Sequence, residues 1–276
     1  MVKCMKKEKV IIIFIVALIV LNVIILVRRV MNNNTNNVKD ENKFVNIKTY
    51  NKDNFERYKK YSEIHSDMSI DEVVKNVNIN IDYNFYETDF KSINNYTPLV
   101  LVNKHYNLGN DYVPSDLENL GYPYAINSDI KGNKEAYQHF KDLYNDASSV
   151  GLTIKIISAY RSYEYQKKLY EGYLKSDPVE IVDTYSARPG HSEHQTGYAF
   201  DLYNVLKSYT DFGSTKEYEW LKINAHLYGF IIRYTKDNTN ITGYKDEPWH
   251  IRYVGIENAK YIYENGITLE EYLLNK

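Results

Sequence analysis

The run from Val10 to Val27 is the feature that most limits how this chain can fold. It reads VIIIFIVALIVLNVIILV, and only Asn22 interrupts its apolar side chains. At about 1.5 Å per residue, a helix of this length just crosses the hydrocarbon core of a bilayer. A helix buried in a protein core would be polar on one face, whereas this run is apolar all round. We therefore predict a transmembrane anchor at residues 10–27.

Basic residues flank this run and indicate its orientation. Four lysines precede it and two arginines follow it. Because cytoplasmic flanks carry the excess of Lys and Arg, we expect residues 1–9 in the cytoplasm. A cleavable signal peptide is the competing interpretation, but its apolar region would be shorter and would end in an A-x-A-like site. The predicted localisation is the cell membrane, with a single membrane pass and an extracytoplasmic C-terminal domain.

The rest of the chain divides by composition into three parts. Residues 28–65 are rich in Asn and Lys, which predicts a polar stalk. A capping-box pattern at Ser69–Glu72 opens a short helical lead-in segment, assigned to residues 66–96. The main domain is expected at 97–276, and its first element is a buried strand at 99–102.

The main domain mixes helical and strand patterns. Helices are expected from about Lys134, from Ser162, and after a second capping box at Ser214–Glu217. Strands are expected at 152–157, 198–203, 230–234 and 249–254. No regular βαβ repeat is present, so we predict an α+β fold in which a small antiparallel sheet is flanked by helices.

Composition excludes several classes of function. Cys4 is the single cysteine, which rules out a disulfide framework, a Cys-based zinc finger and an iron–sulfur cluster within one chain. The formal net charge of −2 gives no reason to expect nucleic acid as a partner. Gly-rich nucleotide loops are absent, so no nucleotide cofactor is expected. Any metal must therefore be held by His and carboxylate side chains.

Two segments of the main domain carry residues suited to such a site. A zinc centre that does chemistry needs three protein ligands and one open position, and His194, Asp201 and His250 could supply the ligands. Residues seven apart on one strand point to opposite faces, so His194 is expected in a loop and Asp201 on the strand that follows. Pro248 places Glu247 in a turn, from which its carboxylate can lean over the metal as a general base.

At this point the sequence resembles a known family. The segments S-A-Y-R-S (158–162), S-E-H-Q-T-G-Y-A-F-D (192–201) and E-P-W-H (247–250) look like the three signatures of VanY-like D-alanyl-D-alanine carboxypeptidases, the zinc peptidases of bacterial cell walls. The resemblance spans about residues 98–254. It implies peptidoglycan stem peptides as substrates and one Zn²⁺ per chain as the cofactor.

The resemblance also implies a role for each matching residue. His194, Asp201 and His250 would hold the zinc, and Glu247 would be the catalytic base. Arg161 would stabilise charge on the scissile carbonyl or hold the substrate. Gln166 and Ser192 match positions that contact the end of the substrate in relatives, although Gln166 could equally lie on a solvated helix face.

Four other functions compete with a zinc D,D-carboxypeptidase. An L,D-carboxypeptidase or a peptidoglycan endopeptidase of the same family would use the same residues. A serine D,D-peptidase finds little support, because Ser128–Lys131 matches S-x-x-K but the companion motifs are absent. A non-catalytic, zinc-bearing wall-binding domain would not need Glu247.

Overall fold

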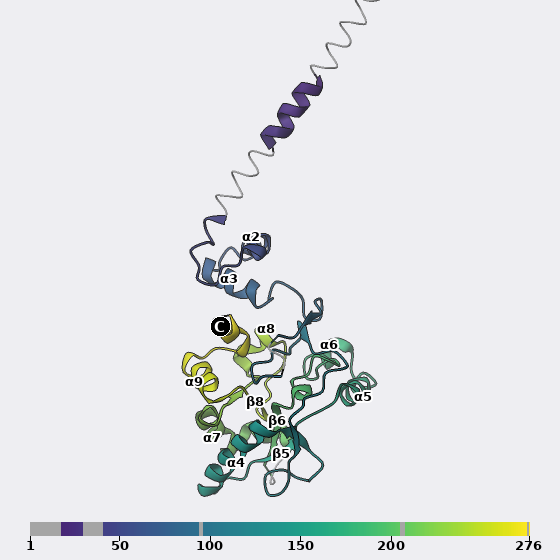
Figure 1. Cartoon of the computed structure of the whole chain (residues 1–276), viewed down its shortest axis with the longest axis vertical. Coiled ribbons are helices and arrows are strands. Elements are labelled where there is room, and N and C mark those ends of the chain that lie inside the picture. The colour runs from purple at the N-terminus through teal and green to yellow at the C-terminus, as the bar shows by residue number, and fades with distance from the viewer. Residues whose placement is uncertain (1–17, 30–40, 94–95, 205–207, 275) are drawn as a thin grey trace, which may run out of the picture. The chain divides into compact units, whose positions relative to one another are not determined.

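The computed structural model describes residues 18–29, 41–93, 96–204, 208–274 and 276. The chain divides into two compact units, residues 1–78 and 79–276. Figure 1 gives the labels of the elements.

The first unit contains a pair of short helices beyond the predicted anchor. Helix α2 covers Phe55–Ile64 and helix α3 covers Ile70–Asn78, and the 3-10 helix η1 (Lys52–Asn54) precedes them. The capping box predicted at Ser69 is present, because Ser69 N donates to Glu72 Oε2 at 2.8 Å and Glu72 N donates to Ser69 Oγ at 3.3 Å. The helices bury a small apolar cluster, which includes Tyr58, Tyr61, Val73, Val74 and Val77.

The predicted membrane localisation is wrong on the evidence of this structure. Within the described ranges, no helix is both long enough and apolar enough to span a membrane. The described part of the predicted anchor is a helix at residues 18–29, whereas residues 1–17 lie outside the described residues. The prediction that this segment contacts a membrane is therefore not supported.

A four-stranded antiparallel sheet forms the centre of the second unit. Its strand order is β5 (Lys155–Ser158), β6 (Ala199–Tyr203), β8 (His250–Tyr253) and β7 (Phe230–Ile232). Two small two-stranded sheets accompany it, formed by β1 (Phe90–Lys91) with β2 (Tyr106–Asn107) and by β3 (Leu117–Asn119) with β4 (Lys131–Asn133). The predicted α+β class is confirmed.

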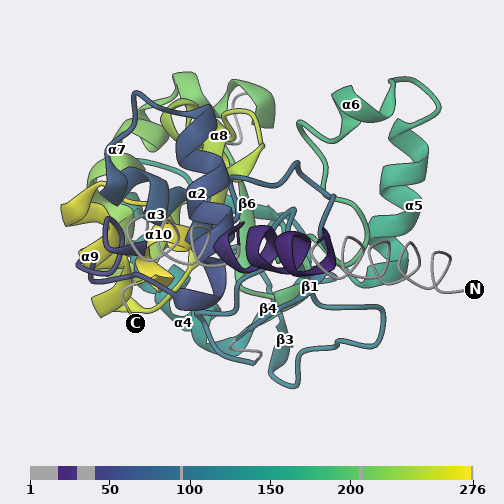
Figure 2. The ribbon, with the colours of Figure 1, turned by 90° about the horizontal axis from the view of Figure 1, so that it is seen from above.

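Helices flank the strand β6 in both views (Figure 1, Figure 2). Helices α5 (Tyr163–Tyr173) and α6 (Val179–Val182) lie on one side of β6, and α7 (Lys216–Asn224) and α9 (Ile256–Asn265) lie on the other (Figure 1, Figure 2). The remaining helices are α4 (Lys134–Ser149), α8 (Thr239–Thr242), α10 (Leu269–Leu273), and the 3-10 helices η2 (Glu193–Thr196), η3 (Tyr209–Ser214), η4 (Ala225–Tyr228) and η5 (Lys236–Asn238).

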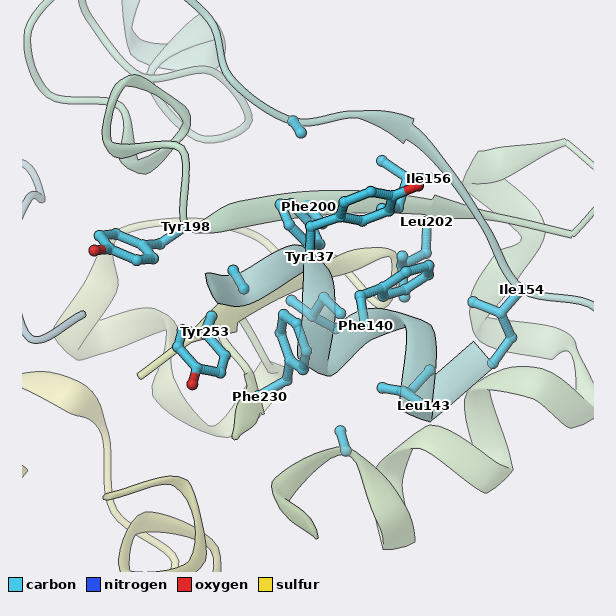
Figure 3. Packing of buried hydrophobic residues seen from close by; sticks show 14 of the residues in the cluster. Tyr137, Phe140, Leu143, Ile154, Ile156, Tyr198, Phe200, Leu202, Phe230 and Tyr253 are labelled. Atoms are coloured by element: carbon cyan, nitrogen blue, oxygen red, sulfur yellow. The ribbon is translucent and has the colours of Figure 1, made fainter. Parts of the chain in front are cut away.

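The main core joins α4 to one face of the sheet. Asn133 caps α4, since its side chain accepts a hydrogen bond from Ala136 N. The ring of Phe140 projects from α4 and meets Phe200 and Phe230 edge to face, with centroids 5.8 and 6.3 Å apart (Figure 3). Aromatic pairs favour this geometry, and the 3.6-residue spacing of apolar side chains in α4 presents its buried face to the strands.

Two predicted elements differ in the structure. Residues 99–102 are not a strand, although Val100 and Val102 are fully buried. The side chain of Arg252 binds two carbonyls in this part of the chain. Its Nη2 donates to Val100 O at 2.8 Å and to Pro98 O at 3.0 Å. The cap of α7 is Thr215 rather than Ser214, because the Thr215 side chain accepts the hydrogen bond from Tyr218 N.

Candidate metal centre

Three of the predicted residues converge on one buried point. His194 lies on η2, Asp201 lies on β6, and His250 is the first residue of β8. Asp201 and His250 are direct partners in the β6–β8 register. One ligand atom from each of the three residues lies within 4.8 Å of the others. The structure thus brings together the three residues whose types and spacing suggested metal ligands.

Residues seven apart on one strand would point to opposite faces, but a tight turn separates His194 from the strand that carries Asp201. Ser192 caps η2, since its side chain accepts from His194 N at 3.3 Å. Gly197 ends η2 with φ of +78°, a left-handed conformation that favours glycine. His194 is thus not part of the strand, so its side chain is not bound by the alternation of β6 and can lie beside Asp201.

Each histidine has one ring nitrogen directed at the centre and the other held by a protein group. His194 Nδ1 donates to Ala159 O at 2.6 Å, while its Nε2 lies 3.3 Å from Asp201 Oδ1. His250 Nδ1 lies 3.2 Å from Asp201 Oδ1, while its Nε2 lies 3.3 Å from Glu193 Oε2. Metal-bound histidines are held in this way, because the second contact fixes the tautomer and the ring orientation.

The charges around the centre favour a cation. Burial raises the pKa of Asp201, but His194 and Arg161 outweigh it and hold that pKa well below its usual range. Burial lowers the pKa of His194 to about 4, which keeps its ring neutral and able to bind a metal. Burial alone would lower the pKa of His250, but its hydrogen bonds to Asp201 and Glu193 raise it to about 9, so these carboxylates stabilise positive charge at the centre. Metal binding at His250 would displace this proton. Two His nitrogens and one carboxylate form a donor set that fits zinc.

Glu247 lies beside the centre. It lies before β8, outside the strand, as the presence of Pro248 in the sequence indicated. Its Oε2 lies 3.9 Å from His250 Nδ1. Burial raises the pKa of Glu247 to about 7. A carboxylate with a pKa near neutral is suited to accept and return a proton at physiological pH.

Arg161 is in direct contact with Asp201. Its Nη2 donates to Asp201 Oδ2 and its Nε donates to Ser158 Oγ at 3.0 Å. Among the described residues these contacts use two of its three nitrogens, so Nη1 is available to a ligand. A guanidinium held in this way can bind a carboxylate or a developing oxyanion.

A cavity of about 380 Å³ opens over the centre and includes every predicted site residue in its lining. Gln166 is 1% exposed, and its Nε2 donates to Ala187 O at 2.8 Å. Its Oε1 has no hydrogen-bond partner within the described part of the chain, so it presents an unused acceptor. The alternative of a solvated helix face for Gln166 is wrong.

A set of buried charges lies behind the centre and was not predicted from the sequence. Glu193 is 2% exposed and contacts His250, and Arg233 Nε donates to Glu193 Oε1 at 2.8 Å. Arg252 Nη1 forms an ion pair with the same oxygen at 2.9 Å. The only indication in the sequence is that Glu193 directly precedes His194, a predicted metal ligand. Its residue type alone predicts an exposed position, because glutamate is usually exposed.

Comparison with known proteins gives a family match over residues 129–256, to the family described as VanY: D-alanyl-D-alanine carboxypeptidase. The YodJ protein of Bacillus subtilis (strain 168) is 41% identical over 63% of this chain and 66% of its own. A D-alanyl-D-alanine carboxypeptidase of Enterococcus faecium is 37% identical over 63% of this chain and 57% of its own. The chain thus spans less than two thirds of the length of these relatives.

A shorter relative is covered almost completely. The bifunctional D-Ala-D-Ala dipeptidase and D-Ala-D-Ala carboxypeptidase VanXYC of Enterococcus gallinarum is 32% identical, over 63% of this chain and 92% of its own.

Solved structures agree with these matches. The LD-carboxypeptidase LdcB is 39% identical with a TM-score of 0.59, over 64% of this chain and 86% of its own. A VanY D,D-pentapeptidase from the VanB-type resistance cassette, solved with Zn(II), is 34% identical with a TM-score of 0.54, over 64% of this chain and 98% of its own.

Proposed function

This chain belongs to the VanY family of D-alanyl-D-alanine carboxypeptidases, and from that premise we propose that it is a zinc D,D-carboxypeptidase that removes the terminal D-alanine from peptidoglycan stem peptides. One observation carries the proposal: His194, Asp201 and His250 form a compact ligand set in a cavity that Glu247 and Arg161 also line. A ligand set alone would suit a structural metal. The added base and cation favour hydrolysis.

His194, Asp201 and His250 would hold one zinc ion. When bound, zinc would supply Lewis acidity, which polarises a carbonyl and brings the pKa of water from about 16 to about 7. The rings are already oriented by Ala159 O and Glu193, so binding requires little rearrangement. The cation at Arg161 keeps Asp201 ionised, as a ligand carboxylate must be.

Glu247 would act first as the general base and then as the general acid. Its carboxylate would accept a proton from the attacking water and deliver it to the nitrogen of the leaving D-alanine. A single group can do both because its pKa of about 7 allows either protonation state near neutral pH. Trp249 and Tyr244 line the same cavity.

Arg161 and Gln166 would position the substrate. The free Nη1 of Arg161 would meet the oxyanion that forms on the scissile carbonyl, or the terminal carboxylate. The unused Oε1 of Gln166 would accept an N–H of the peptide, because a buried acceptor without a partner is unfavourable until a ligand satisfies it. The hydroxyl of Ser192 already caps η2, so its contact with substrate would be secondary.

An L,D-carboxypeptidase is the second candidate. The specific observation in its favour is the similarity to LdcB, a named LD-carboxypeptidase that matches with 39% identity. Both activities would use the same ligands, base and cation, so they differ only in the residue accepted before the scissile bond.

Mass spectrometry of stem peptides tests the proposal. The full chain is loaded with zinc and incubated separately with a pentapeptide and a tetrapeptide stem. We expect loss of one D-alanine from the pentapeptide. Release from the tetrapeptide alone would assign L,D-carboxypeptidase activity. Cleavage only within cross-linked stems would assign an endopeptidase, and zinc binding without any cleavage would assign a wall-binding domain.

A further inference from the structure

A series of buried ion pairs runs from the C-terminal helix to the metal centre. Glu270 lies on α10, and its carboxylate accepts hydrogen bonds from Arg233 Nη1 at 3.0 Å and Nη2 at 2.6 Å. Arg233 Nε donates to Glu193 Oε1 at 2.8 Å. Glu193 Oε2 lies 3.3 Å from His250 Nε2. Three contacts thus connect α10 with a proposed zinc ligand.

Burial makes each of these pairs depend on the next. Glu270, Arg233 and Glu193 are 3%, 1% and 2% exposed. A charge without hydration is tolerated only when it is paired, and loss of one partner leaves the other uncompensated. Glu193 also pairs with Arg252, so two carboxylates face two guanidinium groups. The orientation of the Glu193 carboxylate is therefore set by the two arginines rather than by water.

Helix α10 holds Glu270 in a fixed position. Thr268 N donates to Glu271 Oε2 at 2.9 Å and Glu271 N donates to Thr268 Oγ1 at 3.2 Å, which is a complete capping box. Asn103 Nδ2 donates to Glu270 Oε1 at 3.0 Å. The apolar face of α10 packs into a separate buried cluster. Because the helix start and the carboxylate are both held, Glu270 is a rigid anchor for Arg233.

We propose that α10 is a structural part of the metal centre, in which Glu270 is a positioning residue that orients His250 through Arg233 and Glu193. The proposal rests on zinc binding at His194, Asp201 and His250. Glu270 touches neither the metal nor the substrate. Its contribution is to keep Glu193 Oε2 in place, so that His250 Nδ1 faces the centre.

Zinc titration of the full-length protein tests this inference without any peptidase assay. The zinc dissociation constant is measured by competition with a chromophoric chelator, and the visible spectrum of the Co²⁺-substituted protein reports the ligand geometry. Glu270→Gln keeps the shape of the side chain and removes its charge, and is expected to weaken zinc binding about tenfold. Glu193→Gln is expected to weaken it by up to about 100-fold.

The matched control is Glu264→Gln, an exposed glutamate on α9 that pairs only loosely with Lys260 at 3.9 Å. Its zinc affinity is expected to equal that of wild type. Glu270→Asp keeps the charge and is expected to recover most of the affinity lost in Glu270→Gln. Circular dichroism of each metal-free variant establishes that it is folded before titration.

A double variant separates positioning from general stability. If Glu270 acts through Glu193, then Glu193→Gln with Glu270→Gln loses no more affinity than Glu193→Gln alone. Additive losses, or a Glu270→Gln variant with wild-type affinity and an unchanged Co²⁺ spectrum, would overturn the inference. A wild-type protein that binds no zinc would overturn both this inference and the proposed metal centre.

Discussion

Gly197 is where a single methyl group should disturb the fold and the metal centre together. It lies between His194 and Asp201 and ends η2 with φ of +78°. A Cβ built on it would lie 2.8 Å from Leu117 Cδ2 and 3.2 Å from Asn133 N. The second contact is with backbone that is itself fixed, because Asn133 N donates to Gly197 O at 2.9 Å. Gly197→Ala therefore cannot be relieved by one side chain moving.

Two separate terms give the size of the effect. A residue with a Cβ in the left-handed region loses about 1–2 kcal/mol. Overpacking against fixed neighbours adds about 1–3 kcal/mol, so the unfolding free energy should fall by about 2–5 kcal/mol. Gly151→Ala is the matched control, since Gly151 has φ of +81° but no heavy atom within 4 Å of the added Cβ. It should lose only the first term.

Urea unfolding of the metal-free variants measures the difference. Because η2 carries His194, the displacement caused by Gly197→Ala should also weaken zinc binding, whereas Gly151→Ala should leave zinc binding unchanged. Equal losses of stability in the two variants would refute the steric argument. A destabilised Gly197→Ala with wild-type zinc affinity would refute the claim that this turn positions His194.

Three further predictions concern the base, the metal and a buried lysine. Glu247→Gln should keep zinc but lose about 10²–10⁴-fold in kcat, because an amide cannot accept the proton; an undiminished kcat would contradict its role. Removal of zinc with EDTA should abolish hydrolysis, and calorimetry should show about 2.7 kcal/mol less stability than at a zinc concentration 100 times Kd. Burial lowers the pKa of Lys104 to about 8. The unfolded chain then binds more protons than the folded chain between pH 8 and 10.5, so stability should rise by about 1.5 kcal/mol from pH 8 to 9.5, and urea unfolding of Lys104→Met should lack this rise.

The ligands could be predicted from sequence because they sit in short segments whose local structure is simple. His194 and Asp201 are separated by one turn, and His250 follows a proline that marks the strand start. The helix from Lys134 was equally readable, since its apolar spacing matches the face it buries. Each of these inferences needs only a few neighbouring residues.

The buried charges behind the centre could not be predicted in the same way. Glu193, Arg233 and Glu270 come from three distant segments of the chain, and each is a residue type that usually lies on the solvated surface. Only tertiary pairing makes their burial favourable. The strand predicted at 99–102 was wrong for a related reason. Its apolar side chains predict burial, but they do not reveal that Arg252 donates to the carbonyl of Val100.

The register between β6 and β8 links core packing to the metal centre. Paired residues in an antiparallel sheet point to the same face, so Asp201 and His250 share one face while Phe200 and Ile251 share the other. A slip of β6 by one residue against β8 would turn Asp201 toward the aromatic core, away from His250, and would turn Phe200 into the cavity. The apolar alternation that buries Phe200 and Ile251 therefore also fixes Asp201 opposite His250. Packing on the apolar face is therefore sufficient to place Asp201 and His250 together on the polar face.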